Sequence, residues 1–301
     1  MAEKNIKFLN FGSLNTDMVY TVDHTVRPGE TIVSSKLEYF CGGKGLNQSI
    51  ALSRAGAKVF QAGCVGSDGD CLIEQLEKNG IDVHFVRKSD MPSGHAIIQV
   101  DKNGQNSILC FGGANRQITA EHIADVLSGF KAGDRLFLQN EIGNVDKIIS
   151  AASEKGMDIV FNPSPFGEEI QTFPLEKVSW FVVNETEAQY LTGETVPEKI
   201  LNAFSAKYPS ASILLTLGGD GAYCKADGKI YFRDIFNVPV VDTTAAGDTF
   251  LGFFFATLDS RGVEEALKYA SAASAIAVSR NGASSSIPTV EETENFIKNY
   301  N

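Results

Sequence analysis

Residues 135–162 read RLFLQNEIGNVDKIISAASEKGMDIVFN, and this stretch changes its hydrophobic periodicity twice. Its two ends, Arg135–Gln139 and Asp158–Asn162, are short apolar runs, which are typical of buried strands. Between them, residues 145–155 carry apolar side chains at helical spacing. A strand, a helix and a second strand in this order predict parallel strands that the helix connects.

The same alternation extends along most of the chain. Further strands are predicted at residues 58–65, 83–86 and 180–184, and further helices at 71–78 and 118–130. Because a parallel sheet needs helices on both of its faces, we expect an α/β fold with a mostly parallel central sheet.

Two stretches break this alternation. Residues 18–40, around Arg27-Pro28-Gly29, and residues 94–111, around Lys102-Asn103-Gly104, have the two-residue periodicity and the turns of hairpins. We expect them to form a small sheet over the carboxyl edge of the large one, where ligands of open α/β sheets bind. Two surface hairpins without a role are the alternative. The prediction is one domain, residues 1–301, with a lid made of insertions at about 13–40 and 94–113.

The chain has 301 residues, with 26 Lys and Arg against 37 Asp and Glu, so its formal net charge is −11. This excess of acid argues against a general affinity for nucleic acid or anionic membranes, and an anionic substrate would need a local site. No apolar run reaches the length of a membrane span and no secretory leader is visible, so we expect a cytoplasmic protein. The cysteines lack C-x-x-C spacing and are predicted to be buried thiols in a reducing compartment: Cys41, Cys64, Cys71, Cys110 and Cys224.

The segment most informative about function is VDTTAAGDTF, residues 241–250, which opens an apolar helix. The free backbone N–H groups at a helix start, together with the helix dipole, form an anion site. Ala245, Ala246 and Gly247 keep side chains away from it, so a phosphate can approach the main chain. Asp248 then lies beside the same anion site and could accept a proton from an attacking hydroxyl. Helix capping by Asp248 is the alternative.

A second glycine-rich segment, CGGKGLN at residues 41–47, also leads into a helix. It lacks the frame of a Walker-type phosphate loop, and no G-x-G-x-x-G suggests a dinucleotide. Instead, Gly42, Gly43 and Gly45 expose backbone amides and leave room, while Asn47 offers a donor and an acceptor to a polyol. A tight turn with a solvated Lys44 is the alternative.

Polar residues also follow several predicted strands. Asn15 and Asp17 lie on one face of an extended segment and suit vicinal hydroxyls, or else form an Asx turn. Glu141 follows the strand Arg135–Gln139. Residues 184–187 have a helix-capping pattern, and the glycine-rich residues 216–221 could let a nucleotide lie against the backbone or could make a hairpin. All these strand ends, and the turn after residue 241, should open on one edge of a parallel sheet.

Other chemistries lack their motifs. The chain has no Gly-x-Ser-x-Gly elbow, no His-Glu-x-x-His sequence and 4 histidines, none at metal-ligand spacing, which argues against a hydrolase or a zinc enzyme. We place His95 on the inner face of the second hairpin and interpret it as a surface or core residue, with a ligand contact as the alternative.

The two glycine-rich segments, in this order, resemble the two signatures of the ribokinase (PfkB) family of sugar kinases. The resemblance covers nearly the whole chain, at residues 15–17, 28–31, 42–47, 184–187, 216–221, 242–250 and 275–288. It implies a ribokinase-like three-layer α/β/α sandwich with a mostly parallel central sheet and a small β-sheet lid. Lids of this family often pair into a β-clasp, so a homodimer through the lid is expected.

The activity that the resemblance implies is ATP-dependent phosphorylation of a sugar, D-ribose at O5 first of all, giving ribose 5-phosphate. Asp248 would be the general base, and the anion hole would be formed by Ala245, Ala246, Gly247 and Asp248. The sugar would be held by Asn15, Asp17, Gly43, Lys44, Asn47, Glu141 and Asp248. The nucleotide would lie along Asn184, Thr216, Leu217, Gly218, Gly219, Asp220, Gly221, Gly247 and Ser271.

Two metal ions are implied as well. Magnesium would be carried on the ATP phosphates and positioned by Glu187 through water. Potassium would lie beside the anion hole, near Ser286, held by Asp242 and by the backbone carbonyls of Thr244, Ala277, Arg280 and Gly282.

The sequence departs from the family pattern at Leu46, where a small residue is common, and at His95, where an aliphatic residue is usual. Both departures are expected to bear on the sugar pocket. The alternatives are therefore a kinase of this family for fructose, 2-deoxyribose, adenosine or pseudouridine, or a catalytically silent sugar-sensing protein. The intact residues around Asp248 argue against the silent protein.

Overall fold

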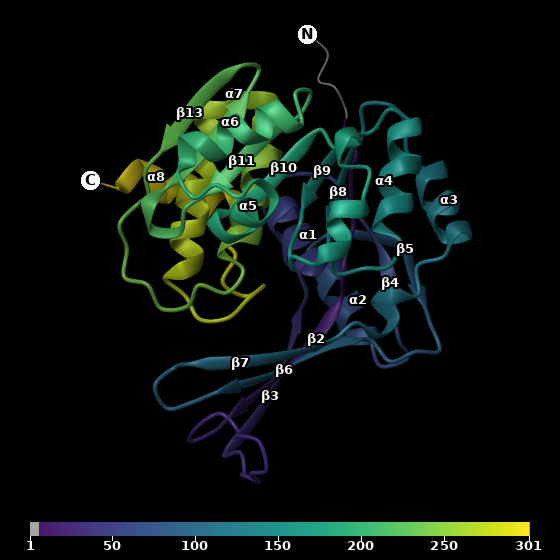
Figure 1. The fold of residues 1–301 in the computed structure, drawn as a ribbon. Helices are drawn as coiled ribbons and strands as arrows, with labels where there is room; N and C mark the ends of the chain where they lie inside the picture. The colour runs from purple at the N-terminus through teal and green to yellow at the C-terminus, as the bar shows by residue number, and fades with distance from the viewer. Residues whose placement is uncertain (1–5, 301) are drawn as a thin grey trace.

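The computed structural model describes residues 6–300. They form a large sheet with a layer of helices on each face and, separately, a small second sheet (Figure 1). The strands of the large sheet, in their order across it, are β13 (Lys229–Arg233), β12 (Ala222–Ala226), β11 (Ser212–Thr216), β10 (Trp180–Asn184), β9 (Asp158–Asn162), β8 (Arg135–Gln139), β1 (Phe8–Phe11), β4 (Val59–Val65) and β5 (Asp82–Lys88). Every neighbouring pair from β11 across to β5 is parallel, whereas the pairs β11–β12 and β12–β13 are antiparallel. The predicted mostly parallel sheet is therefore confirmed.

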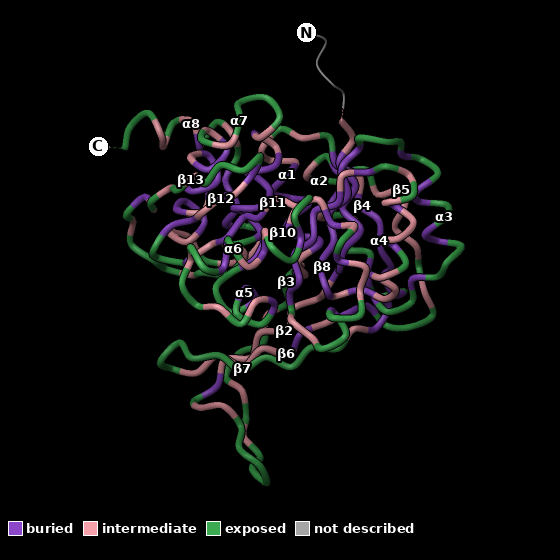
Figure 2. The backbone as a smooth tube through the Cα atoms, turned by 45° about the horizontal axis from the view of Figure 1, so that its top comes forward, coloured by how far each residue is buried: buried purple, intermediate pink, exposed green. Residues whose placement is uncertain are grey.

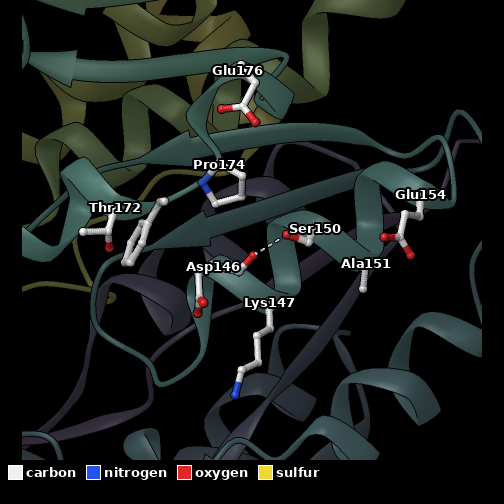
Figure 3. A pocket seen from close by; sticks show the side chains of 9 residues that line it. Asp146, Lys147, Ser150, Ala151, Glu154, Thr172, Pro174 and Glu176 are labelled. Carbon is white, nitrogen blue, oxygen red and sulfur yellow. Dashed lines mark hydrogen bonds between the residues drawn. The ribbon is translucent and has the colours of Figure 1, made fainter.

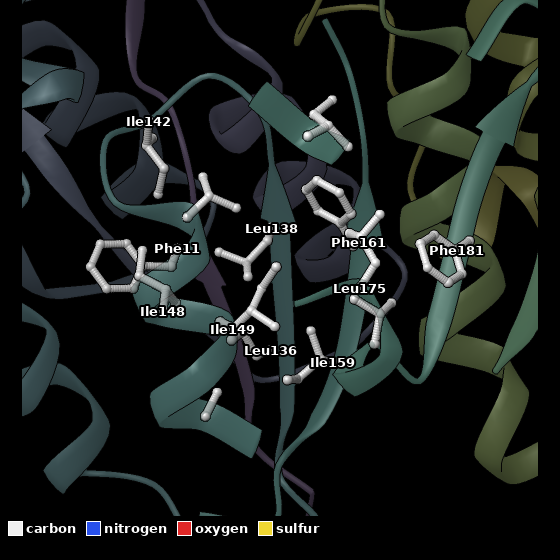
Figure 4. Close-up of a cluster of buried hydrophobic side chains, with 14 of the residues drawn as sticks. Phe11, Leu136, Leu138, Ile142, Ile148, Ile149, Ile159, Phe161, Leu175 and Phe181 are labelled. Carbon is white, nitrogen blue, oxygen red and sulfur yellow. The ribbon is translucent and has the colours of Figure 1, made fainter. Parts of the chain in front are cut away.

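Helices cover both faces of this sheet, because its buried strands point apolar side chains alternately to each side. In β8, for example, Leu136 and Leu138 join one core while Phe137 joins the other. The first core lies under α3 (Ala120–Ser128), α4 (Val145–Glu154), α5 (Glu185–Thr192) and α6 (Pro197–Lys207), and Figure 4 shows part of it. The second lies under α1 (Lys44–Arg54), α2 (Asp70–Lys78) and α7 (Ala246–Val278), with α8 (Val290–Asn299) against α7.

The boundaries predicted from periodicity differ from the observed ones by one or two residues at helix ends. The helix predicted at 118–130 is α3, which is shorter at both ends. Thr119 caps it by accepting a hydrogen bond from the His122 N–H at 3.1 Å, and Gly129 follows its last residue. The long helix α7 contains a kink at Gly262, whose φ of 78° is left-handed.

The second sheet has the strand order β3 (Lys36–Gly42), β2 (Asn15–Thr21), β6 (Gly94–Val100) and β7 (Asn106–Phe111). β2 and β6 are parallel and pair at the centre, and the two outer pairs are the antiparallel hairpins expected from the sequence. This small sheet projects from the body of the molecule, and its strands are mostly exposed or half-buried (Figures 1 and 2).

The cysteines only partly follow the prediction of buried thiols. Cys64 and Cys224 are buried in the cores, and Cys41 is half-buried. Cys71 and Cys110 are exposed, which contradicts the prediction for these two. The reason is their position, since Cys71 lies in the first turn of α2 and Cys110 lies on the outer strand β7 of the small sheet.

Among the helices of residues 6–300, none combines the length and the apolar character that crossing a membrane requires.

Candidate active site

The strand ends singled out in the sequence meet at one edge of the large sheet. β1, β8, β9, β10 and β11 are parallel neighbours, so the residues that follow them share the carboxyl edge. The start of α1 is held there by a hydrogen bond from the Leu46 N–H to the Ser13 carbonyl at 3.0 Å. The edge predicted from the motifs is therefore the place where their side chains come together.

The glycine-rich segment at residues 41–47 owes its small residues to close packing. A Cβ on Gly45 would lie 2.5 Å from the Gly12 carbonyl carbon, so α1 can begin this close to β1 only with glycine at both positions. A Cβ on Gly42 would lie 2.0 Å from Asp17 Oδ2. The room that these glycines leave is thus filled by this chain's own backbone and by Asp17.

Asp248 lies in the first turn of α7 and is buried. Its Oδ1 accepts a hydrogen bond from Gln48 Nε2 at 2.9 Å, and its Oδ2 accepts one from Asn47 Nδ2 at 3.3 Å. The N-cap residue of α7 is Ala245, and no side chain caps this helix. The capping role considered for Asp248 is therefore wrong, because its carboxylate faces α1 instead.

The backbone before Asp248 makes a sharp turn at Ala245. Ala245 has φ 60° and ψ 10°, a left-handed conformation that few residues other than glycine adopt. A Cβ on Gly247 would meet no atom within 4 Å, so the surface above this turn is open. The amides of Gly247 and Asp248 belong to the first helical turn, whose N–H groups have no acceptor within the helix.

Asn15 and Asp17 lie on the same face of β2, as their spacing predicts, and the Asx turn considered for them is not formed. Asn15 Oδ1 accepts a hydrogen bond from Asn115 Nδ2 at 2.7 Å. Burial, together with the negative charge of Glu141, raises the pKa of Asp17 to about 6. The sequence reasoning missed Asn115, which follows the glycine pair 112–113 after the second hairpin, and that glycine pair was the available signal.

Glu141 and Lys44 connect these groups. Glu141 Oε2 accepts hydrogen bonds from the Ser13 hydroxyl and, at 3.2 Å, from the Lys44 N–H. Burial alone would lower the pKa of the Lys44 ammonium. Three surrounding carboxylates outweigh burial and raise this pKa, those of Asp248, Glu141 and Glu187. The alternative of a freely solvated lysine is therefore wrong.

The residues predicted to bind the nucleotide also lie at or after strand ends, at Asn184 of β10 and after Thr216 of β11. Asn184 and Glu187 form a capping box. The Glu187 N–H donates to Asn184 Oδ1 at 2.9 Å, and the Asn184 N–H donates to Glu187 Oε2 at 3.0 Å. The loop Leu217–Gly221 connects β11 to antiparallel β12, so the hairpin alternative for it is confirmed. Open space above Gly218 and Gly219 still lets a ligand approach this loop. Ser271 is buried and donates to the Asp234 carbonyl at 3.2 Å.

The two segments expected to hold potassium are neighbours. Asp242 Oδ1 accepts from the N–H and hydroxyl of Thr244 at 2.9 and 2.6 Å, and its Oδ2 accepts from the Gly282 N–H at 2.9 Å. Burial would raise the pKa of Asp242, but these hydrogen bonds lower it overall. Ser286 donates to the Ala283 carbonyl at 2.8 Å. In the part of the chain that the structure describes, no three His, Cys, Asp or Glu side chains cluster as metal ligands.

The two departures from the family pattern do not lie where they were expected. The register pairs His95 with Thr16 and Ala96 with Asp17, so His95 is on the face of the small sheet opposite Asp17. Its ring lies against Phe111, with the centroids 5.1 Å apart. Leu46 is fully buried in the second core. The inner-face placement of His95 is therefore wrong, and the Leu46 side chain belongs to the core.

Two surface grooves lie elsewhere. One of about 560 Å³ runs along α4 and is lined by Asp146, Lys147, Ser150, Ala151, Glu154, Thr172, Phe173, Pro174 and Glu176 (Figure 3). The other, of about 510 Å³, lies between α7 and α8. Neither contains any of the polar residues around Asp248.

Comparison with known proteins identifies the family of this constellation. A family model described as pfkB family carbohydrate kinase matches residues 5–290. The chain belongs to this family. A ribokinase of Haemophilus influenzae is 35% identical over 297 residues, which are 95% of this chain and 97% of that protein. A deoxyribokinase of Salmonella typhi is 32% identical, over 95% of this chain and 97% of that protein.

Solved structures give the same answer for the fold. A ribokinase from Thermotoga maritima superposes with a TM-score of 0.86 at 34% identity, covering 98% of this chain and 99% of that one. An Arabidopsis thaliana ribokinase complexed with ribose and ATP has a TM-score of 0.85 at 27% identity, covering 97% and 99% of the two chains. The predicted ribokinase-like α/β fold is confirmed.

The raised pKa of Asp17 predicts a pH-dependent stability. Because its pKa is about 6 in the folded chain against an ordinary 3.8, the folded state binds this proton more tightly than the unfolded state does. The resulting stabilisation is present at low pH and is lost as the pH rises through 6. Asp17→Asn removes the titration, so the free energy of unfolding of the variant minus that of the native chain should increase between about pH 4 and pH 7.

Chemical denaturation at a series of pH values measures this difference. The matched control is Asp90→Asn, which removes an exposed carboxylate outside the site and so tests whether the change with pH belongs to Asp17. A constant difference for Asp17→Asn would contradict the environment described for Asp17.

Proposed function

We propose that this chain is an ATP-dependent ribokinase that phosphorylates O5 of D-ribose and produces ribose 5-phosphate and ADP. The observation that carries the proposal is the position of Asp248. Its buried carboxylate lies between the first-turn amides of α7 and the polar residues Lys44 and Asn47 of α1. One carboxylate is thus next to both an anion site and a set of groups suited to hydroxyls.

The sugar side of the site consists of acceptors and donors that match a polyol. Asn15, Asp17 and Glu141 offer oxygens from β2 and from the loop after β8. Asn47 Oδ1 is buried and has no hydrogen-bond partner within residues 6–300, so a sugar hydroxyl would satisfy it. Gly43 and Lys44 complete the predicted sugar contacts at the start of α1.

In the proposed reaction, Asp248 accepts the proton of the sugar hydroxyl. The oxygen of this hydroxyl forms a bond to the γ-phosphorus of ATP, and the bond from that phosphorus to the β-phosphate oxygen of ADP breaks. The amides of residues 245–248 would stabilise the charge on the transferred oxygens. The cation of Lys44 offsets the negative charge of the surrounding carboxylates.

The nucleotide is proposed to lie between Asn184, the loop 216–221 and the start of α7, with Ser271 near the adenine. Magnesium would be held mainly by the ATP phosphates, with Glu187 beside them. The magnesium ion would neutralise phosphate charge there. The second carboxylate oxygen of Glu187 is available for this role, because the capping box uses Oε2. The small sheet is proposed to act as a lid that excludes water.

The test is an assay of ATP-dependent phosphorylation over a panel of acceptors with magnesium. We expect D-ribose to give a higher kcat/KM than fructose, 2-deoxyribose, adenosine and pseudouridine. The position of His95 removes the observation that favoured another furanoside or a nucleoside. A higher kcat/KM for any other acceptor would contradict ribose as the substrate while leaving the kinase activity intact.

The variant Asp248→Asn belongs to the same test. It should fold normally and lower kcat on the order of 10² to 10⁴-fold, because a general base contributes roughly that much. An unchanged kcat would remove Asp248 from the role of base, and turnover that depends on Asp248 would exclude a silent sugar sensor.

A potassium site is proposed beside the anion hole. Its predicted donors are oxygens, the carboxylate of Asp242 and the carbonyls of Thr244, Ala277, Arg280 and Gly282, with Ser286 nearby, and oxygen donors suit a hard cation. The fit is supported by the contact between Asp242 and Gly282, which joins the two segments that carry these donors.

Replacing potassium by tetramethylammonium should lower kcat several-fold, because the large ion cannot occupy a compact oxygen site. The assay compares both salts at equal ionic strength. Asp242→Asn should make the rates in the two salts similar. Equal rates for the native chain in the two salts would contradict the site.

A homodimer is proposed through the small sheet. Tyr39, Met18, Ile97 and Leu109 are paired across the face opposite Asp17, and Tyr39 and Leu109 are 63% and 68% exposed. Large apolar side chains that cross an unpaired face favour contact with a second copy. A cytoplasmic location stays a prediction from the sequence.

Light scattering should report twice the mass of one chain for the native protein and a lower mass for Leu109→Asp. The matched control is Ile230→Asp on β13, where an equally apolar side chain is 50% exposed outside the small sheet. A monomeric native protein, or dissociation by both variants, would contradict pairing through this face.

A further inference from the structure

Gln48 contacts the carboxylate of Asp248, although no motif in the sequence singled it out. It is fully buried on α1. Its Nε2 donates to Asp248 Oδ1 at 2.9 Å and to Asn162 Oδ1 at 3.3 Å, while its Oε1 accepts from Gln139 Nε2 at 2.7 Å. Both ends of this amide are therefore used inside the protein.

Gln48 is the centre of a chain of buried amides that starts at β1. Asn10 Nδ2 donates to the Gly45 carbonyl at 2.9 Å, and Asn10 Oδ1 accepts from Gln139 Nε2 at 3.0 Å. Gln139, at the end of β8, also donates to Gln48. Three elements, β1, β8 and α1, are thus connected to the carboxylate on α7.

Backbone carbonyls at both ends fix the direction of this chain. A carbonyl accepts only, so the Gly45 carbonyl requires the NH₂ group of Asn10 and leaves Asn10 Oδ1 for Gln139. At the other end, the Val182 carbonyl accepts a hydrogen bond from Asn162 Nδ2 at 2.9 Å. This leaves Asn162 Oδ1 to accept from Gln48. Gln48 can satisfy both neighbours only with its NH₂ group toward Asp248.

A second feature of the packing makes Gln139 rigid. A Cβ on Gly12 would lie 2.3 Å from Gln139 Oε1, so the side chain of Gln139 fills the space that Gly12 leaves. Gln139 Oε1 is itself buried without a hydrogen-bond partner among residues 6–300, so Gln139 is held by this packing and by the two bonds that its Nε2 donates, while Gln48 has partners at both ends of its amide. The amide of Gln48 therefore holds a fixed donor against one oxygen of Asp248.

We propose that Gln48, fixed by Gln139 and Asn10, is a positioning residue for Asp248. It occupies Oδ1 and leaves Oδ2, whose contact with Asn47 is the longer one, as the oxygen that accepts the proton of the sugar hydroxyl. The inference rests on the proposed role of Asp248 as general base. It assigns to Gln48 the orientation of that carboxylate and no contact with substrate.

The first measurement is the steady-state kinetics of Gln48→Met, which removes both polar ends of the side chain at similar volume. We expect kcat to fall on the order of 10-fold to 10²-fold, with the KM for the sugar changed by less than about 3-fold, because a misplaced base affects the transition state more than binding. A fall in kcat/KM that comes from KM alone would overturn the proposal.

The matched control is Gln61→Met. Gln61 is also fully buried, donates to the Gly12 and Ala62 carbonyls and accepts from the Ser49 hydroxyl, but does not contact Asp248. It should lower the Tm about as much as Gln48→Met while leaving kcat close to that of the native chain. Equal losses of kcat in the two variants would mean that Gln48 is merely structural and would overturn the proposal.

The second measurement is a double-mutant cycle with Asp248→Asn. If Gln48 acts through Asp248, adding Gln48→Met to Asp248→Asn should change the residual kcat by less than about 2-fold. The same fold-loss in both backgrounds would overturn the proposal. A native kcat for Asp248→Asn alone would instead contradict the proposed function, so the two failures are distinguishable.

If Gln48→Met does not fold, Gln48→Glu replaces it. This variant keeps the shape of the side chain and the acceptor for Gln139 but has no NH₂ group to donate to Asp248. We expect its kcat to fall at least 10-fold, on the scale of a lost orienting hydrogen bond. A native kcat for a folded Gln48→Glu would overturn the proposal.

Discussion

The close crossing of α1 and α7 is the contact on which the rest of the site depends. A Cβ on Gly252 would lie 2.3 Å from the Ala51 Cβ, so the two helices meet where both residues are small. This contact brings Asp248, one turn before Gly252, against Asn47 and Gln48. A carboxylate buried this far needs donors, and α1 supplies them. Packing between two helices that are far apart in the sequence therefore sets the chemistry of the site.

The site contains more carboxylates than cations, and Lys44 is the cation they share. Three carboxylates act on Lys44, those of Asp248 on α7, Glu187 on α5 and Glu141 in the loop after β8. No cation among residues 6–300 offsets Asp17 in this way, and burial next to Glu141 raises its pKa to about 6. The carboxylate of Asp248 thus has hydrogen-bond donors, whereas burial disfavours the charged form of Asp17. Such contrasting environments for like groups are common where residues bind and transfer protons.

Much of the fold could be predicted from the sequence. The strands Arg135–Gln139, Asp158–Asn162 and Trp180–Asn184 have the predicted bounds, because apolar runs and turns are local signals. The motifs around Asp248 and Lys44 were also visible, since helix starts and glycine-rich turns are local too. Predictions that depended on which face a residue occupies were less successful. His95 was placed on the wrong face of the small sheet, because the register between β2 and β6 is not encoded in either strand alone.

The sequence by itself determined the alternation of strands and helices, the family, and the two segments that supply the site. Only the tertiary structure decided which of the buried polar residues serve that site. Gln48 and Asn115 are ordinary amides in the sequence, and their partners Asp248 and Asn15 are distant in the chain. Hydrogen bonds between such residues depend on distance and direction in space, and the spacing of residues along a chain contains neither.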